Sequence, residues 1–153
     1  VVVDVNEKKL MIASQLGAHY TFNSTLKNCT EQILDLTDGG VHYAFETAGV
    51  PPALDLAYKI TKRGGMTIVA GMPGPEAKIT LSHLSLSAEE RIIKGSYMGS
   101  CVPNRDIPRY IDLYKNESLP VDKLIGERFS FDGLNEALDR LDDGEALRQI
   151  LIF

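Results

Sequence analysis

The sequence predicts an α/β fold in which helices cover a parallel sheet. Short apolar runs rich in β-branched residues alternate with segments of helical periodicity over the first seventy or so residues. Glycines, prolines and helix-capping residues bound these segments, at a spacing that suits repeated right-handed βαβ units. The chain has 153 residues, 44% of them hydrophobic, which is enough to bury one core of ordinary size.

The first half of the chain supplies the strands of that sheet. The predicted strands are Val1 to Val3, His19 to Phe22, Val41 to Glu46 and Met66 to Gly71. The first is a wholly apolar, β-branched run, which is typical of a strand buried on both faces of a parallel sheet. A helical segment follows each of the first three strands, so we expect the strands to run parallel.

Capping residues and prolines mark where the intervening helices begin. Asn6 is placed to cap a helix from Glu7 to Leu16 that Gly17 ends. Asn28 and Glu31 have the spacing of a capping box at the start of a second helix.

A third helix is predicted to begin at a pair of prolines. Pro51 and Pro52 suit its first turn, and Gly64-Gly65 is expected to break it before the strand that begins at Met66.

The second half of the chain is less regular. Its predicted elements are a strand (Lys78 to Leu81), a helical turn, a strand (Ile92 to Met98), a helix from Pro103, a strand (Arg128 to Phe131), a helix through Leu134 and Leu141, and a strand (Gln149 to Phe153). Pro108 is expected near the first turn of its helix, because a proline deeper inside removes a hydrogen bond and kinks the helix.

Composition excludes some classes of partner. A formal charge of −5 and a pI near 5.2 argue against nucleic acid, whose binders carry basic stripes. No stretch approaches the ~18–20 apolar residues that span a bilayer, so no membrane partner is expected. Cys29 and Cys101 match neither a disulfide framework nor a metal-site spacing, which favours a cytoplasmic protein with reduced thiols.

Candidate binding residues follow the predicted strands, because ligands of open parallel sheets bind at the carboxyl ends of the strands. The segments to consider are Asp4, Glu46 to Gly49, Ala70 to Met72, and Ser96 to Gly99. Asp4 can accept the hydroxyl protons of an adenosine ribose and repel a 2′-phosphate, or it can serve only as a helix-flanking residue. Lys9 can reach the same ribose, or it can be a solvated side chain.

Glycines and histidines leave further questions open. Gly49 and Gly71 permit a close approach to a flat ligand ring, although a turn role suits each equally. The Gly-rich phosphate loop of dinucleotide folds lies about 20 residues before the acidic residue, which here falls before Val1. His19, His42 and His83 are scattered, so no catalytic residue or metal-ligand set is predicted in this chain.

A set of short motifs follows in order along the chain: VVVDVN (1–6), LGA (16–18), TDGGV (37–41), FETAG (45–49), GG (64–65), VAGMP (69–73), KGS (94–96) and GEALR (144–148). The set resembles the zinc-dependent, medium-chain alcohol dehydrogenases. Each motif alone is unspecific, but their order and spacing hold over essentially the whole chain.

The resemblance implies a Rossmann-type doubly wound parallel sheet that lacks its first strand, with a C-terminal α+β extension. Residues 1–97 would be a partial dinucleotide-binding domain, and residues 98–153 a C-terminal segment of the catalytic domain. The missing strand is central, between the strands at Val1 and Val41, so two interior ladders are left unpaired. We therefore expect the isolated chain to be marginally stable, or to pair those edges differently or with another chain.

The resemblance also implies residue roles in binding NAD. The implied cofactor contacts are Asp4 and Lys9 at the adenosine ribose, Thr47, Ala48, Ala70 and Gly71 along the cofactor, Met72 at the nicotinamide, Ser96 and Met98 at its carboxamide, and Arg148 at the pyrophosphate. Met72, Gly74 and Tyr97 would border the substrate pocket, and residues 81–93 the subunit contact of a homo-oligomer, a dimer or tetramer.

The implied function is hydride transfer between an alcohol or aldehyde and NAD, with zinc as a Lewis acid. The zinc ligands would lie upstream of Val1, so this chain alone is not expected to be catalytically competent. Three alternatives stay open. One is a zinc-free quinone or enoyl reductase, whose usual NADP preference Asp4 opposes. Another is an S-adenosylmethionine methyltransferase, whose sheet normally ends in a reversed hairpin. The third is a non-catalytic nucleotide-binding or dimerisation module.

Overall fold

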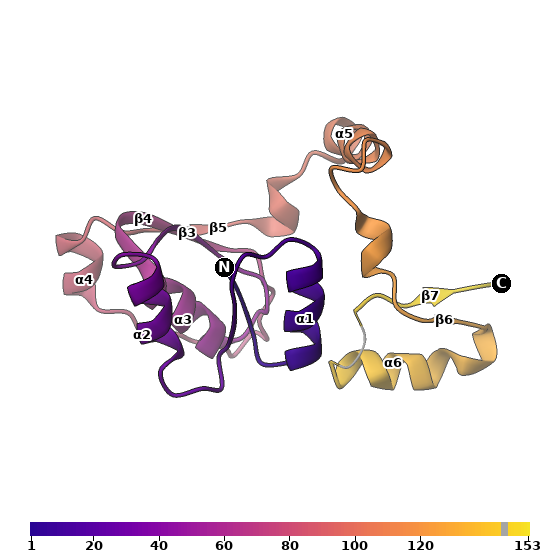
Figure 1. Cartoon of the computed structure of the whole chain (residues 1–153), viewed down its shortest axis with the longest axis horizontal. Helices are drawn as coiled ribbons and strands as arrows, with labels where there is room; N and C mark the ends of the chain where they lie inside the picture. The colour runs from indigo at the N-terminus through magenta and orange to yellow at the C-terminus, as the bar shows by residue number, and fades with distance from the viewer. Residues whose placement is uncertain (145–146) are drawn as a thin grey trace. The chain divides into compact units, whose positions relative to one another are not determined.

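The computed structural model describes residues 1–144 and 147–153, which divide into two units, Val1–Cys101 and Val102–Phe153 (Figure 1). Glu145 and Ala146, which belong to the GEALR motif, lie outside the described residues. The division into a cofactor domain and a catalytic segment at residue 97 concerns function, and it stays a prediction.

The first unit alternates strands and helices as predicted. Its elements are β1 (Val2–Asp4), α1 (Glu7–Gln15), β2 (Thr21–Asn23), α2 (Cys29–Leu36), β3 (Val41–Glu46), α3 (Pro51–Ile60), β4 (Thr61–Val69), α4 (His83–Ala88), β5 (Ile92–Gly95) and the 3-10 turn η1 (Tyr97–Ser100). Every strand pairing in it is parallel. The parallel α/β architecture is therefore confirmed.

The strands of this unit form two sheets rather than one. β1 pairs with β2, and β3, β4 and β5 pair in that order. Among the described residues no strand pairs with the free side of β1 or of β3. The predicted pair of unpaired ladders is thus present, and two strand edges carry open N–H and C=O groups.

One hydrophobic core joins the two sheets. Its buried members are Cys29 and Ile33 from α2, Ala44 from β3, and Ala57 and Ile60 from α3, with Val3, Phe22, Val41 and Leu56 packed against them. α2 and α3 lie side by side, and both contribute to this core (Figure 1). Because Val3 and Phe22 belong to β1 and β2, the core holds the small sheet to the large one.

Cys29 belongs to this core. Burial raises the pKa of its thiol, and the nearby Glu31 carboxylate raises it further. The thiolate is the reactive form of cysteine, and a raised pKa disfavours it. Cys29 therefore serves in the core as a small apolar group.

β3 is covered on one face only. Ala44 and Glu46 are buried, whereas Tyr43 and Phe45 on the opposite face are 63% and 69% exposed. Within the unit Val1–Cys101 no helix covers that second face, although a doubly wound sheet implies helices on both.

The boundary between α3 and β4 was predicted wrongly. β4 begins at Thr61, directly after the helix, rather than at Met66. The Thr61 hydroxyl donates to the Ala57 carbonyl at 2.7 Å and lies 2.8 Å from the Thr67 hydroxyl. The bond to Ala57 satisfies a carbonyl of the last helical turn, and the backbone becomes extended from Thr61 onward. Gly64-Gly65 instead forms an irregularity inside the strand, where the register with β3 shifts.

The two predicted helix caps differ in outcome. The Asn6 side chain accepts from the Lys8 and Lys9 amides, which confirms the first cap. Asn28 makes no side-chain capping bond, so the predicted capping box is wrong. Its ψ of 18° departs from the extended conformation that Asn6, with ψ of 113°, adopts.

Lys78 to Leu81 does not form the predicted strand. Among the described residues this segment pairs with no strand of either sheet. A short extended segment without a partner cannot form a ladder.

The second unit holds α5 (Pro103–Lys115), β6 (Arg128–Phe129), α6 (Leu134–Asp142) and β7 (Ile150–Leu151), with short 3-10 turns at Val121–Leu124 and Phe131–Gly133. β6 and β7 pair in parallel. Pro108 is the sixth residue of α5 rather than a first-turn residue, so that expectation was wrong. Its missing N–H faces the carbonyl of Asn104, an exposed residue whose carbonyl water can satisfy.

Candidate cofactor site

The carboxyl ends of β3, β4 and β5 are aligned. Glu46 pairs in register with Val69, and Val69 with Gly95. The pairing continues just beyond the strands, where the Ala70 amide donates to the Glu46 carbonyl and the Ser96 amide to the Val69 carbonyl, both at 2.8 Å. The structure thus brings the predicted contacts after all three strands to one edge of the sheet. Those residues are Thr47, Ala48, Ala70, Gly71, Met72 and Ser96.

Large apolar side chains stand exposed after β4 and β5. Met72 and Tyr97 are each 72% exposed, and Met98 is 73% exposed. Single exposed apolar residues are ordinary, but a group of them at a strand-end edge is typical of a ligand surface. Gly74, the other predicted border of the substrate pocket, is exposed, and a side chain there would meet nothing within 4 Å.

The turn after β5 has an unusual backbone. Met98, Gly99 and Ser100 all adopt positive φ, at 48°, 68° and 54°. The left-handed region disfavours residues with a Cβ by about 1–2 kcal/mol each. The Ser96 and Ser100 hydroxyls lie 3.2 Å apart and tie the two ends of this turn together. Such strain is common where a backbone is shaped for a ligand.

Gly49 and Gly71 interlock the turns that follow β3 and β4. A Cβ on Gly71 would lie 2.6 Å from the Gly49 Cα, and a Cβ on Gly49 would lie 2.7 Å from the Met72 carbonyl oxygen. Gly49 also has a φ of +71°. Both glycines therefore serve in turns, as one of the two predicted roles required. Glycine is needed because the two backbones pack directly against each other.

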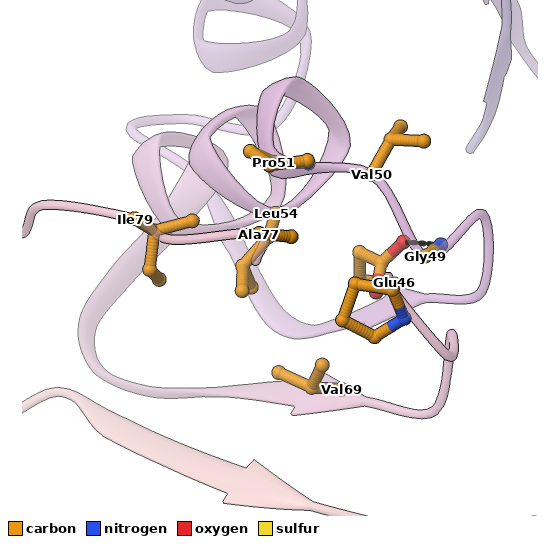
Figure 2. A pocket seen from close by; sticks show the side chains of 9 residues that line it. Glu46, Gly49, Val50, Pro51, Leu54, Val69, Ala77 and Ile79 are labelled. Atoms are coloured by element: carbon orange, nitrogen blue, oxygen red, sulfur yellow. Dashed lines mark hydrogen bonds between the residues drawn. The ribbon is translucent and has the colours of Figure 1, made fainter. Parts of the chain in front are cut away.

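Glu46 lies beneath these interlocked turns. It is 3% exposed, and its Oε1 accepts from the Gly49 amide at 2.6 Å (Figure 2). The side chain borders a cavity of about 100 Å³ lined by Glu46, Gly49, Val50, Pro51, Leu54, Val69, Pro73, Ala77 and Ile79. Pockets that bind drug-sized ligands measure roughly 300–1,000 Å³. A dinucleotide therefore does not fit inside this cavity, and the open edge above it is the better candidate.

Asp4 stands at the carboxyl end of β1. Its Oδ1 accepts from the Asn6 amide at 2.9 Å, so the helix-flanking role is present. Its Oδ2 accepts no hydrogen bond from any described residue, which leaves one carboxylate oxygen for a ligand. Lys9, on the first turn of α1, is half-buried, and its ammonium has no partner in the described parts of the chain.

Asn23 is a neighbour of Asp4 that the sequence did not single out. The two residues pair in register across β1 and β2. The Asn23 amide donates to the Glu7 carboxylate at 2.5 Å. Asn23 thereby ties the end of β2 to the first turn of α1, on which Lys9 lies.

Arg148 belongs to the second unit, where it is exposed. Its carbonyl accepts from the Gly126 amide at 2.7 Å, and a Cβ on Gly126 would lie 2.9 Å from that same oxygen. Gly126 therefore fixes the backbone of Arg148 just before β7.

The described residues do not fit a zinc ion. Nowhere in 1–144 and 147–153 do three or more His, Cys, Asp or Glu residues gather as metal ligands. None of the helices in those ranges is long and apolar enough to cross a membrane.

Glu46 is the buried residue of the candidate site for which the sequence predicts no role. It was included in a strand-end segment, but its contacts were not foreseen. A signal was available, because strand alternation puts Glu46 on the same face as Ala44, and an acid on a buried face needs a partner.

Comparison with known proteins shows the family. The sequence profile described as zinc-binding dehydrogenase matches residues 1–116. A geraniol dehydrogenase of Castellaniella defragrans is 31% identical over the whole chain, which covers 41% of that protein. Alcohol dehydrogenase-like 5 of Arabidopsis thaliana is 35% identical over 97% of the chain, which covers 39% of that protein. The chain thus spans about two-fifths of the length of these relatives.

Solved structures of related dehydrogenases support the same family assignment. The benzyl alcohol dehydrogenase of Acinetobacter calcoaceticus superposes with a TM-score of 0.92 at 30% identity, over 98% of this chain and 41% of that one. A zinc-binding alcohol dehydrogenase domain protein of Burkholderia ambifaria gives a TM-score of 0.91 at 29% identity, over 98% and 40%. The chain therefore belongs to the zinc-binding dehydrogenase family, the zinc-dependent medium-chain alcohol dehydrogenases that its sequence resembles.

Proposed function

We propose that this chain supplies most of the NAD site of an alcohol dehydrogenase that interconverts an alcohol and its aldehyde. The observation that carries the proposal is the shared carboxyl edge of β3, β4 and β5, together with the open oxygen of Asp4 at the end of β1. Ligands of parallel α/β sheets bind outside such edges.

The chain's own groups fit the two ends of NAD. The free Oδ2 of Asp4 accepts a hydrogen bond from a ribose hydroxyl, and the negative charge of Asp4 opposes a 2′-phosphate. Lys9 is proposed to contact the same sugar. The exposed Met72 offers an apolar surface to a flat ring, and Ser96 and Met98 offer backbone groups to its carboxamide. Arg148 is proposed to neutralise the pyrophosphate. NAD, when bound, accepts or returns a hydride at its nicotinamide ring.

The remaining assignments extend the same proposal. Residues 1–97 act as the dinucleotide-binding part, and residues 98–153 as a segment of the catalytic domain. The zinc ligands and the Gly-rich phosphate loop lie in other parts of the protein, and the chain alone is inactive. Met72, Gly74 and Tyr97 border the alcohol. The protein works in the cytoplasm as a homo-oligomer through residues 81–93.

One alternative function loses support. A methyltransferase sheet normally ends in a reversed hairpin, whereas every strand pairing in the described chain is parallel. A zinc-free quinone or enoyl reductase differs chiefly in preferring NADP, so the choice of dinucleotide decides between it and our proposal.

The test is a titration of the full-length protein with NAD and with NADP. Asp4→Ala removes a charge-assisted hydrogen bond, so we expect the dissociation constant for NAD to rise about tenfold or more. The preference for NAD over NADP should fall at the same time. Asp35→Ala is the matched control, because Asp35 is an exposed acid on α2 that no predicted contact involves.

Two results would contradict the proposal. One is tighter binding of NADP than of NAD by the wild-type protein. The other is an unchanged affinity for NAD in Asp4→Ala.

A further inference from the structure

Glu46 makes hydrogen bonds with two chain segments that meet at the candidate site. Its side-chain Oε1 accepts from the Gly49 amide at 2.6 Å, in the turn after β3. Its main-chain carbonyl accepts from the Ala70 and Gly71 amides at 2.8 and 3.0 Å, in the turn after β4. One residue therefore holds three amide groups across two turns.

The same two turns touch through their backbones, with Glu46 directly below. A Cβ on Gly71 would lie 2.8 Å from the Glu46 Oε2 as well as close to the Gly49 backbone. The carboxylate thus contacts the turn at Gly49, as Figure 2 shows, and lies close to Gly71 as well. Moving it would release Gly49 and open space beneath Gly71.

Burial makes this arrangement specific. Glu46 is 3% exposed, and apolar side chains such as Leu54 and Val69 line the small cavity beside it. Burying a carboxylate in such surroundings carries a desolvation cost. An apolar side chain at position 46 would fill the same space without that cost. A requirement for an acceptor facing the Gly49 amide accounts for it.

We propose that Glu46 is a positioning residue that locks the turns after β3 and β4 into the shape that binds the dinucleotide. It acts through Thr47 and Ala48 on one turn and Ala70 and Met72 on the other. This inference rests on the proposed function, because these are the residues assigned to the cofactor.

The test compares substitutions at Glu46 in the full-length protein. Glu46→Gln keeps an oxygen facing the Gly49 amide, whereas Glu46→Met fills the space without a comparable acceptor. We expect the dissociation constant for NAD to rise about tenfold in Glu46→Met and to stay within about twofold in Glu46→Gln. The Michaelis constant for NAD should rise in parallel.

Thr67→Val is the matched control for a loss of stability alone. Thr67 is fully buried in β4, and its hydroxyl contacts Thr61 rather than either turn. We expect Thr67→Val to lower the melting temperature while keeping NAD affinity within about twofold. The proposal is overturned if Glu46→Met binds NAD like the wild type. It is also overturned if Thr67→Val weakens binding as much at an equal loss of melting temperature.

Two further measurements keep the test decisive. If Glu46→Met does not fold, Glu46→Asp withdraws the carboxylate by one methylene, and we expect about a threefold rise in the dissociation constant. If the wild-type protein binds no dinucleotide, the proposed function fails, and hydrogen exchange then decides separately whether the Glu46 side chain holds the two turns. We expect the Gly49, Ala70 and Gly71 amides to exchange about tenfold faster in Glu46→Met, or in Glu46→Asp if that variant is used, than in the wild type. Thr67→Val should show no such increase. Unchanged exchange rates in the Glu46 variant refute the proposal that this side chain holds the two turns.

Discussion

The two ends of the candidate site are built differently. At the ends of β3 and β4, backbone packs against backbone and the buried Glu46 holds three amides. At the end of β1, Asp4 and Asn6 make local hydrogen bonds, and the side chains around them reach solvent. Buried backbone contacts hold the first region, whereas partly exposed side chains make up much of the second. Steric substitutions at the interlocked glycines should therefore cost the most stability, and substitutions of Asp4 and Lys9 should mainly change ligand binding.

Gly71→Ala should have the largest effect. Its Cβ would overlap the backbone of Gly49, so the two turns must separate, at a cost of about 3 kcal/mol in the free energy of unfolding. Urea denaturation of the full-length protein measures this. Gly74→Ala is the control, because its Cβ meets open space and should cost no more than about 0.5 kcal/mol. Equal losses in the two variants would mean that the turns do not interlock.

The open side of β3 should produce the next largest effect. Tyr43 and Phe45 leave an apolar face beside an unpaired strand edge, so the isolated 153-residue chain should self-associate. Changing both to Lys should weaken this association about tenfold in sedimentation experiments. Met11→Lys, at a 59% exposed position on α1, should have little effect. A wild-type chain that stays monomeric, unfolds cooperatively and melts at high temperature would refute this expectation.

Helix capping near Asp4 should have a smaller effect. Asn6→Ala removes the acceptor for the Lys8 and Lys9 amides and should cost about 1 kcal/mol of stability. Asn28→Ala should cost close to nothing, because Asn28 makes no capping bond. Thermal denaturation of the pair tests the contrast, and a larger loss for Asn28→Ala would reverse it.

Lys9 should show the smallest effect. Lys9→Ala removes one partly exposed charge from the proposed ribose site, which should weaken NAD binding about two- to fivefold. Lys8→Ala changes the neighbouring exposed lysine and should leave the affinity unchanged. Calorimetric titration distinguishes them, and identical affinities would remove Lys9 from the site.

Local signals in the sequence were sufficient for most elements of the first unit. Asn6 caps α1, and Pro51 begins α3, because capping and proline geometry act over only a few residues. Asn28 has the same capping signal as Asn6, but the predicted cap is absent because the backbone of Asn28 adopts another conformation in the folded chain. Thr61 was misplaced because its hydroxyl bonds to Thr67, a contact that needs the finished β4.

The candidate site was predictable in position but not in construction. The strand ends follow from the parallel topology, so Asp4 and Ala70 could be singled out from sequence. The interlock of Gly49 with Gly71 joins turns from two strands, and no local pattern encodes that approach. The role proposed for Glu46 likewise appears only when its carbonyl and carboxylate are seen to serve different turns.

The most direct test of the account is a crystal structure of the full-length protein with NAD. We predict the adenosine ribose hydroxyls within hydrogen-bond distance of Asp4 Oδ2, and the nicotinamide against Met72 and Ser96. The turns at Gly49 and Gly71 should keep their contact. A dinucleotide bound away from the carboxyl edge, or an Asp4 that contacts only the Asn6 amide, would contradict the account.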